Sequence, residues 1–461
     1  MKLHKALLLG TLVVTMTGCE GDDSDDILDS DIIPDITLSE ERIDIDESLG
    51  SVSFRGSQTL ALSAGIGNGA FHFRDDDIDE FYTITDRGPN IACDESKAVI
   101  GIENFCRDNS NALDEEGQIF PMSHFTPTIY KLNIDTGGLL GKKVGYQVVQ
   151  TIPLLDRDDD PITGLPNPLQ VMTTEKGYDN DGKQLPFDPE GIDSEAIVKL
   201  SNGQFWIADE YAPSLVHVAA NGRILERVVP IGVENDLKDA NYRVIGALPN
   251  ILTKRPLNRG IESLAISPDE QFLYFIMESP LENPNHQAYQ NSRYVRLFKL
   301  SLHLGDLDSM VGEYVYIIDE PETFTADNST QQSDVKISDM VALGTDRLVI
   351  LERLTRHTKL YRLSSLDGAT NILGTEWDIG SVQSNSVALE TLPNLAARGI
   401  IPVSKKQVFD SRREISDLDS KIEGIAILDD EYVAFINDND FGIEGQKTRV
   451  RVAKVAKQLN E

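Results

Sequence analysis

Acidic side chains stand at both ends of four similar segments of the chain, where they can hold a metal ion. Each segment is a pair of apolar runs around a polar turn, and the four lie at residues 195–210, 262–279, 339–353 and 423–440. An acid precedes or begins the first run, and another ends the second run 13 to 16 residues later. In an antiparallel hairpin the start of one strand lies beside the end of its partner. The two acids of each segment are therefore expected at one edge of a sheet.

The apolar runs predict an all-β fold. From about residue 50 onward they have strand length, are separated by Asp, Gly, Pro and Asn, and show almost no sustained helical period. A fifth acid-ended segment lies at 63–88, and hairpins without terminal acids follow at 214–230 and 293–318. Two hairpins make a four-stranded blade, and blades repeated around an axis make a β-propeller. The chain is therefore predicted to form a β-propeller with long acidic loop insertions.

The number of blades is less directly given by the pattern. Five acid-ended hairpins are visible, and residues 365–420 can hold a further irregular unit. We predict six blades, and five to seven are compatible with the pattern. A short helix is expected within residues 393–413, which are polar and rich in arginine.

Hairpins stacked around one axis bring their terminal acids to one mouth of the central channel. Like charges this close repel and cannot all stay ionised without a counter-charge. Calcium accepts six to eight oxygen ligands, and the sequence has no His or Cys cluster with zinc spacing. Calcium is therefore the expected cofactor; alternatively, these residues are ordinary turn and strand-end residues. The expected ligands are Asp86, Glu190, Glu195, Asp209, Glu210, Glu262, Glu278, Glu352, Glu423, Asn437, Asp438 and Asp440.

Three arginines adjoin acids at this predicted mouth, namely Arg87 in TDRG, Arg259 in NRGIE and Arg353 in LER. Arginine grips phosphate oxygens in a bidentate manner, and a bound metal lowers the pKa of the attacking water. With Glu262 these arginines are the expected catalytic residues; alternatively, each is a structural partner of its neighbouring acid. The sequence has no Gly-x-Ser-x-Gly elbow and no P-loop, so a covalent serine-esterase mechanism is not supported.

The N-terminus predicts export. Lys2 and Lys5 precede an apolar run too short to span a membrane, and small residues then precede Cys19. The Thr-Gly-Cys ending resembles a bacterial lipobox, which implies cleavage before Cys19 and lipid attachment to its thiol; a plain signal with a chance cysteine is the alternative. The expected division is a lipoprotein signal peptide at 1–18, an acidic tether and N-terminal segment at 19–49, and the propeller domain at 50–461. The expected location is the periplasmic face of the outer membrane or the cell surface.

The other two cysteines predict a disulfide, and the net charge limits the possible partners. Cys93 and Cys106 lie in one predicted loop of an exported chain, where a disulfide is expected and two free thiols are the alternative. The formal net charge of -34 argues against a basic surface that would bind nucleic acid or an anionic membrane. We expect a monomer that contacts the membrane only through its lipid anchor.

Several strings, taken together, resemble the phytase-like family known as esterase-like activity of phytase. They span about residues 50 to 455. They are TDRGPN at 85–90, DPEGIDSEAI at 188–197, FWIADEYAPSLVHV at 205–218, NRGIESLAISPD at 258–269, LVILER at 348–353, KIEGIAIL at 421–428 and INDNDFG at 436–442. The resemblance implies an exported bacterial β-propeller, related to calcium-dependent propeller phytases, that hydrolyses a small phosphorylated substrate.

Two other functions fit the same pattern of residues. One is a lactonase-like hydrolase of carboxyl esters, in which a channel calcium activates water against an ester carbonyl. The other is a non-catalytic propeller that calcium stabilises and that binds a partner or glycan through one face. A propeller hosts many functions, so its fold does not decide among the three.

Overall fold

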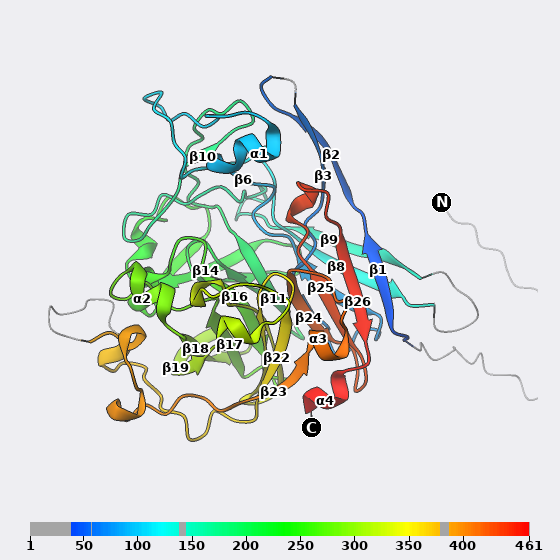
Figure 1. Ribbon diagram of the computed structural model, residues 1–461, viewed down its shortest axis with the longest axis vertical. Coiled ribbons are helices and arrows are strands. Elements are labelled where there is room, and N and C mark those ends of the chain that lie inside the picture. Colours follow the sequence, from blue (N-terminus) through cyan, green and yellow to red (C-terminus); the bar gives the residue numbers. More distant parts are fainter. Residues whose placement is uncertain (1–37, 57, 138–143, 379–386, 461) are drawn as a thin grey trace, which may run out of the picture. The chain divides into compact units, whose positions relative to one another are not determined.

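The computed structural model describes residues 38–56, 58–137, 144–378 and 387–460, all within one compact unit of residues 36–461. The predicted signal peptide and Cys19 lie outside the described residues. Within this unit strands are the main regular elements, and they pair mostly antiparallel, as the apolar runs predicted (Figure 1). No helix among the described residues is long and apolar enough to cross a membrane.

Five sheets of four or five strands are arranged around a closed ring of inner strands, which makes the fold a β-propeller (Figure 1). Each inner strand contacts the inner strands of the sheets before and after it, and the last contacts the first. The inner strands are, in ring order, β4 (Asn68–Phe71), β11 (Ser194–Lys199), β16 (Ile261–Ile266), β20 (Lys336–Gly344) and β24 (Ile422–Ile427).

The outer strands of the first four blades follow their inner strand in sequence. The first blade continues with β5 (Glu80–Ile84), β8 (Thr128–Asp135) and β9 (Gly145–Pro153). The second continues with β12 (Phe205–Asp209), β13 (Ser214–Val218), β14 (Ile224–Pro230) and β15 (Arg243–Leu248). The third continues with β17 (Phe272–Met277), β18 (Tyr294–His303) and β19 (Asp306–Ile317). The fourth continues with β21 (Arg347–Arg353), β22 (Thr358–Leu363) and β23 (Lys405–Asp410).

The fifth blade joins the two ends of the described chain. After β25 (Val433–Asn437) and β26 (Thr448–Ala453), its outermost strand is β1 (Glu41–Ile45), which pairs antiparallel with β26 (Figure 1). Leu38, Ile43 and Ile45 are buried in the core that the fifth blade shares with the first. The domain boundary predicted at residue 50 is thus too late, because β1 is the outer strand of the fifth blade.

The expected count of six blades is not confirmed. In the described part of residues 365–420 the chain contributes β23 to the fourth blade, together with short helical turns, and adds no further sheet. Because the inner strands already close as a ring of five, a sixth has no place between them. The short helix expected within 393–413 is present as the turn η8 (Ala396–Arg398) and the beginning of α3 (Ser411–Glu414), with β23 between them.

The hydrophobic core lies between the blades. Separate clusters of buried side chains fill the space between the first and second blades, among the second, third and fourth, between the fourth and fifth, and between the fifth and first. Trp206 is the largest fully buried side chain, and its indole N–H donates to the Gly305 carbonyl at 3.0 Å. The clusters hold neighbouring blades together, and so they fix the inner strands that carry the site.

Two small sheets and several short helices lie outside the ring of blades. A two-stranded sheet pairs β2 (Ser48–Ser53) with β3 (Thr59–Ser63), and a three-stranded sheet consists of β6 (Ile91–Ala92), β7 (Gln118–Ile119) and β10 (Gly177–Tyr178). Cys93 and Cys106, predicted to pair, form a disulfide in the loop that holds β6 and β7. The remaining helices are α1 (Ser96–Ile100), α2 (His286–Asn291), α4 (Ala456–Asn460), η1 (Cys93–Glu95), η2 (Val233–Asn235), η3 (Asn250–Lys254), η4 (Pro321–Thr323), η5 (Gln332–Asp334), η6 (Glu376–Asp378), η7 (Leu389–Thr391) and η9 (Asp440–Gly442).

Candidate metal centre

A β-bulge occurs near the start of every inner strand, at the same position in each blade. In each case one residue is skipped in the pairing with the second strand. Such a bulge re-aims the side chain of the extra residue and is common beside functional sites. The extra residues are Gly69, Glu195, Glu262, Ser338 and Glu423.

The ends of the second strands supply further residues to the same mouth. Glu210 and Glu278 directly follow β12 and β17, Arg353 ends β21, and Asp438 follows β25. The residue before each of these pairs with the start of its inner strand. Because side chains alternate between the two faces of a strand, adjacent residues point in opposite directions. One residue of each adjacent pair therefore reaches the mouth, and the other packs within or between blades.

The second and third blades bring five carboxylates into two overlapping groups. Asp193, Glu195 and Glu210 offer one ligand atom each within 4.8 Å of one another, and so do Glu210, Glu262 and Glu278. Glu210 belongs to both groups, and its Oε1 is buried without a hydrogen-bond partner in the described part of the protein. An orphaned buried oxygen among carboxylates fits a bound cation, and a set of oxygen donors alone fits a hard cation such as calcium.

The close approach of the two blades at this point requires a glycine. Gly260 precedes β16, and a Cβ atom built there would lie 1.9 Å from the backbone oxygen of Glu210. The absence of a side chain at Gly260 therefore allows Glu210 of the second blade to reach Glu262 of the third.

The pKa shifts in the two groups show that ionisation of all their carboxylates together is unfavourable. Burial, and then the neighbouring carboxylates, raise the pKa of Glu195, Glu210 and Glu262 well above the ordinary value. Burial also raises the pKa of Asp193 to about 6, although Arg87 opposes the shift. A cation bound among these groups would reverse the shifts, because it favours the ionised form of each ligand.

Glu278 differs from the other carboxylates of the centre because two cations neutralise it. Its carboxylate lies 2.7 Å from Lys336 Nζ and 3.3 Å from Arg259 Nη1. Burial acts to raise its pKa, but Arg259 and Lys336 outweigh burial and lower it to about 2. The side chains of Arg259 and Lys336 are 22% and 24% exposed, so both cations are accessible beside the carboxylates.

Arg353 connects the third, fourth and fifth blades at the mouth. Its Nε donates to Ser338 Oγ at 2.8 Å, and its Nη2 donates to the Glu423 carboxylate. Ser338 Oγ in turn donates to Glu262 Oε2 at 3.0 Å. This chain of contacts links Glu423 to Glu262 through Arg353 and Ser338, with Arg353 as the counter-charge of Glu423.

Arg87 is enclosed rather than open to a substrate. Its side chain is 3% exposed and forms ion pairs with Glu175 at 2.9 Å and Asp193 at 3.3 Å. The rings of Phe120 and Tyr211 lie against its guanidinium at 5.3 and 5.5 Å. Arg87 therefore positions Asp193, in agreement with the structural alternative, and the structure gives it no route to an anion.

The remaining acids of the mouth come from the first and fifth blades. Burial and nearby carboxylates raise the pKa of Asp86 and Asp438, and Asp86 is one of the carboxylates that raise the pKa of Asp438. Asp440 pairs with Lys421, and its pKa is lowered because Asp438 and Lys421 outweigh the effect of burial. These residues extend the acidic mouth beyond the two carboxylate groups.

Three of the expected ligands are placed elsewhere because their oxygens already have partners. Asp209 is fully buried in an ion pair with Arg227 at 2.6 Å. The Asn437 side chain accepts from the Arg449 backbone N–H and donates to two backbone carbonyls. Glu190 lies in a loop of the long insertion, where it accepts from the backbone N–H of Asn241.

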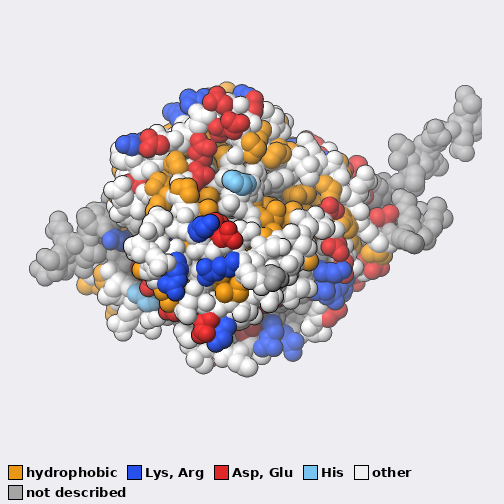
Figure 2. All heavy atoms as spheres, turned by 90° about the horizontal axis from the view of Figure 1, so that it is seen from above, with side chains coloured by type: hydrophobic (Ala, Val, Ile, Leu, Met, Phe, Trp, Pro, Cys, Tyr) orange, Lys and Arg blue, Asp and Glu red, His pale blue; other side chains and the backbone are white. Residues whose placement is uncertain are grey.

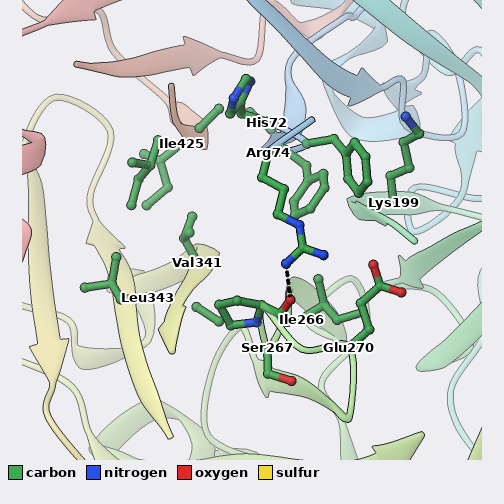
Figure 3. Close-up of a pocket in the computed structure, with 16 residues that line it drawn as sticks. His72, Arg74, Lys199, Ile266, Ser267, Glu270, Val341, Leu343 and Ile425 are labelled. Carbon is green, nitrogen blue, oxygen red and sulfur yellow. Dashed lines mark hydrogen bonds between the residues drawn. The ribbon is translucent and has the colours of Figure 1, made fainter. Parts of the chain in front are cut away.

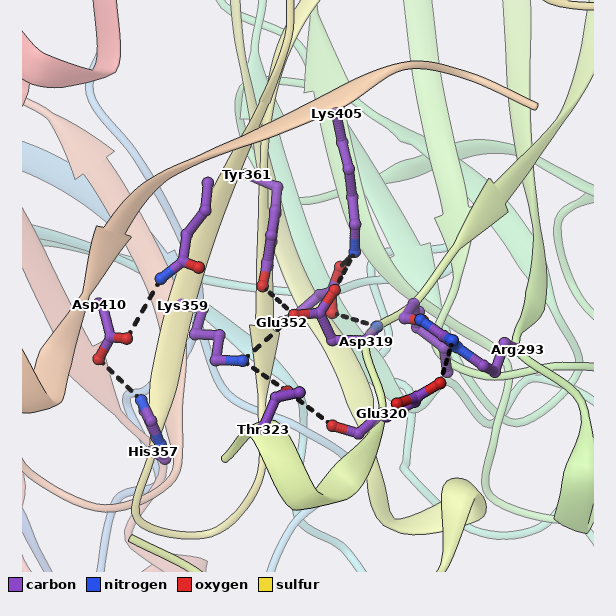
Figure 4. A network of polar contacts seen from close by, with 12 residues as sticks. Arg293, Asp319, Glu320, Thr323, Glu352, His357, Lys359, Tyr361, Lys405 and Asp410 are labelled. Atoms are coloured by element: carbon purple, nitrogen blue, oxygen red, sulfur yellow. Dashed lines mark hydrogen bonds and ion pairs between the residues drawn. The ribbon is translucent and has the colours of Figure 1, made fainter. Parts of the chain in front are cut away.

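Glu352 was also expected at the mouth, but it belongs to a separate network between the third and fourth blades (Figure 4). Its carboxylate accepts from Tyr316 at 2.5 Å and from the Asp319 backbone N–H at 2.9 Å, and it pairs with Lys405. Lys405 also lies 2.9 Å from Asp319, whose pKa falls to about 2 because this lysine and other partners outweigh burial. Since lysines balance both acids, the network stabilises the packing of the blades.

Four residues of the centre were not predicted from the acid-ended hairpins. Asp193 stands just before β11 and two positions before Glu195, so the spacing of these two acids was the signal for it. Lys336 and Ser338 were not predicted because Asp339 was taken as the leading acid of the segment 339–353, whereas the bulge puts Ser338 in the position that Glu195, Glu262 and Glu423 occupy in their blades. Glu175 lies in an irregular loop, and no sequence signal pointed to it.

The outer surface has charges of both signs on the side seen from above in Figure 2. Acidic side chains gather on one part of this face, while lysine and arginine side chains lie beside acidic ones near its centre. The strongly negative net charge therefore does not exclude an anion from this face.

A family model described as phytase-like, esterase-like activity of phytase, matches residues 70–441. Among curated proteins, an uncharacterized secreted protein of Arthroderma benhamiae is 26% identical over an alignment of 238 residues, with 45% of this chain and 45% of that protein covered. The chain thus spans less than half of the length of that relative.

Solved structures with a similar arrangement share little sequence with this chain. The Malassezia sympodialis allergen Mala s 1 is 8% identical, with 89% of this chain and 91% of that chain covered and a TM-score of 0.33. The Pseudomonas aeruginosa periplasmic gluconolactonase PpgL is 9% identical, with 90% and 99% covered and a TM-score of 0.32. The β-propeller domain of Myceliophteria thermophila Cps50 (Swd1) is 9% identical, with 89% and 100% covered and a TM-score of 0.31.

Proposed function

This chain belongs to the phytase-like family, and we propose that it is an exported, metal-dependent hydrolase of phosphate esters. The observation that carries the proposal is the pair of buried carboxylate groups that share Glu210, with Arg259 and Lys336 beside them. Carboxylates that hold cations, next to accessible positive side chains, make a site for an anionic substrate. The description of the family and the word "secreted" in the name of the curated relative support hydrolysis and export.

Different residues of the site would bind the metal and the substrate. Asp193, Glu195, Glu210, Glu262 and Glu278 would hold the metal, which we propose to be calcium, and it would supply a water of lowered pKa and charge stabilisation.

Among the three predicted arginines, Arg259 is the one placed to contact a phosphate, because Arg87 is enclosed and the side chain of Arg353 is 5% exposed. Lys336 is the second such cation. Both can bind the non-bridging oxygens while Glu262 and Glu210 stay with the metal.

The substrate and setting complete the proposal. The substrate is a small phosphorylated molecule, and the protein acts as a monomer without nucleic acid. Cys19 carries a lipid that attaches the chain to the periplasmic face of the outer membrane or to the cell surface; mass spectrometry of the exported protein tests this.

The proposal is tested by the release of phosphate from p-nitrophenyl phosphate and from an inositol phosphate, with calcium and with EDTA. We expect release with calcium, a loss of at least tenfold with EDTA, and a comparable loss in Glu210→Gln. Glu190→Gln is the matched control, since that glutamate was an expected ligand but lies outside the centre, and its activity should equal that of the wild type.

The same panel includes p-nitrophenyl acetate and a lactone. Calcium-dependent turnover of these esters without release of phosphate would replace the proposal with a carboxyl-ester hydrolase. Calcium-dependent stabilisation without turnover of any substrate would indicate a binding propeller instead.

A further inference from the structure

The far end of the central channel contains a cavity that is separate from the acidic mouth. It has a volume of about 220 Å3 and is bounded by residues on or just beyond all five inner strands. Figure 3 shows apolar side chains from several strands facing this space. The apolar lining includes Phe71, Ile266, Val341, Leu343, Ile425 and Ile427.

The position of the cavity along the inner strands sets it apart from the metal centre. Ser338 faces the acidic mouth, whereas Val341 and Leu343, three and five residues later in β20, line the cavity. Between them the Asp339 carboxylate accepts from the backbone N–H groups of Ile425 at 2.7 Å and Ala70 at 3.4 Å. This carboxylate ties β20 to β24 and β4, so the two ends of the channel are distinct sites.

One cation stands over the apolar lining. Arg74 extends across the opening, and its guanidinium donates to the Pro268 carbonyl at 2.6 Å (Figure 3). Its side chain is 60% exposed, and its contact with Asp75 is a loose one of 4.0 Å. An arginine guanidinium has five N–H donors, so it can receive a carboxylate while it keeps the bond to Pro268.

The other charged groups at the opening are already engaged. The Lys199 ammonium lies 4.2 Å from the centre of the Phe73 ring and 3.6 Å from Asp76. Both carboxylate oxygens of Glu270 accept from Ser201, at 2.8 Å each. Arg74 is therefore the charge available to a ligand.

We propose that this cavity binds a small molecule with a short apolar body and one carboxylate, with the body among the apolar side chains and the carboxylate on Arg74. The volume is below the 300 to 1,000 Å3 of pockets for drug-sized ligands, which favours a chain of about eight carbons or a single ring. The charge of Arg74 favours an anion over a neutral or cationic head group.

The test is isothermal titration calorimetry with octanoate, octanol and octylammonium on the full chain. EDTA is present throughout, so that octanoate cannot bind through a metal at the acidic mouth. We expect octanoate to bind at least tenfold more tightly than octanol, and octylammonium to bind more weakly than either. Hexanoate should bind about 15-fold more weakly than octanoate, since each methylene contributes roughly fourfold. Equal affinity for octanoate and octanol, or no binding of octanoate, would overturn the proposal.

Variants locate the binding. Arg74→Gln should abolish the preference for octanoate over octanol and leave the affinity for octanol unchanged. Arg413→Gln, which removes an exposed arginine of α3 that does not line the cavity, should change neither. Leu343→Glu should weaken octanoate by at least tenfold. Because Arg74 is exposed, its variant should fold even if Leu343→Glu does not, and an unchanged preference in Arg74→Gln overturns the assignment by itself.

Discussion

Asp209 and Glu210 are adjacent in sequence, yet the structure gives them opposite roles, and substitution of each tests that assignment. Asp209 is fully buried against Arg227 and also accepts from Ser214 Oγ at 2.6 Å. Glu210 belongs to both carboxylate groups. We expect Asp209→Asn to lower stability whether or not metal is bound, and Glu210→Gln to remove only the stabilisation by metal.

The expected changes in unfolding free energy and Tm follow from the environment of each carboxylate. Asp209→Asn leaves the Arg227 guanidinium buried without its counter-charge, which costs about 3 to 5 kcal/mol. For a unit of roughly 420 residues the unfolding entropy is about 0.9 kcal/mol per degree, so the Tm should fall by about 3 to 6 °C. In Glu210 burial and neighbouring carboxylates raise the pKa, so its ionised form is disfavoured in the fold. An uncharged amide should therefore leave the metal-free Tm equal or slightly higher.

The rise in Tm on addition of calcium is the second quantity to be measured. Calcium at about 100 times its Kd stabilises the folded state by about 2.7 kcal/mol, which here corresponds to a rise in Tm of about 3 °C. Differential scanning calorimetry with EDTA and with calcium should show this rise in the wild type, in Asp209→Asn from its lower baseline, and in Glu190→Gln as a control. Glu210→Gln should show no rise. A full rise in Glu210→Gln, or a wild-type Tm in Asp209→Asn, would refute the reasoning.

Three further variants test other parts of the structure. Asp319 has a pKa of about 2 in the fold and 3.8 in the unfolded chain, so its contribution of roughly 2 kcal/mol to stability is present above pH 3.8 and is lost as the pH falls through 2. In urea titrations the difference in unfolding free energy between the wild type and Asp319→Asn should therefore shrink over this pH interval. A constant difference would contradict the lowered pKa. Gly260→Ala should lower the free energy of unfolding by about 1 to 3 kcal/mol and weaken the binding of calcium, because the Cβ of the new alanine would collide with the backbone of Glu210. Wild-type stability together with wild-type affinity for calcium would show that the close approach is not needed. Cys93→Ser together with Cys106→Ser should cost roughly 3 kcal/mol in chemical unfolding, since the bridge closes a short loop, and an unchanged midpoint would show that the loop does not unfold with the domain.

The sequence by itself determined the class of fold and the general location of the acids. The apolar runs at 205–208, 272–277 and 348–351 correspond to β12, β17 and β21, because strand length and turn residues are local properties. Acids at both ends of repeated hairpins had to meet at one edge of each sheet, since antiparallel pairing requires it.

Only the tertiary structure decided which acid of each adjacent pair faces the mouth. A shift of one residue turns a side chain to the other face of its strand, and the bulges that set this register are not visible in the residue types. Glu210 was thereby separated from Asp209, and Arg353 from Glu352. The count of five blades was likewise decided by the pairing of β1 with β26 and of β23 with β22, which joins segments far apart in the chain. Local sequence determines where strands begin and end, whereas contacts between distant segments determine what their side chains meet.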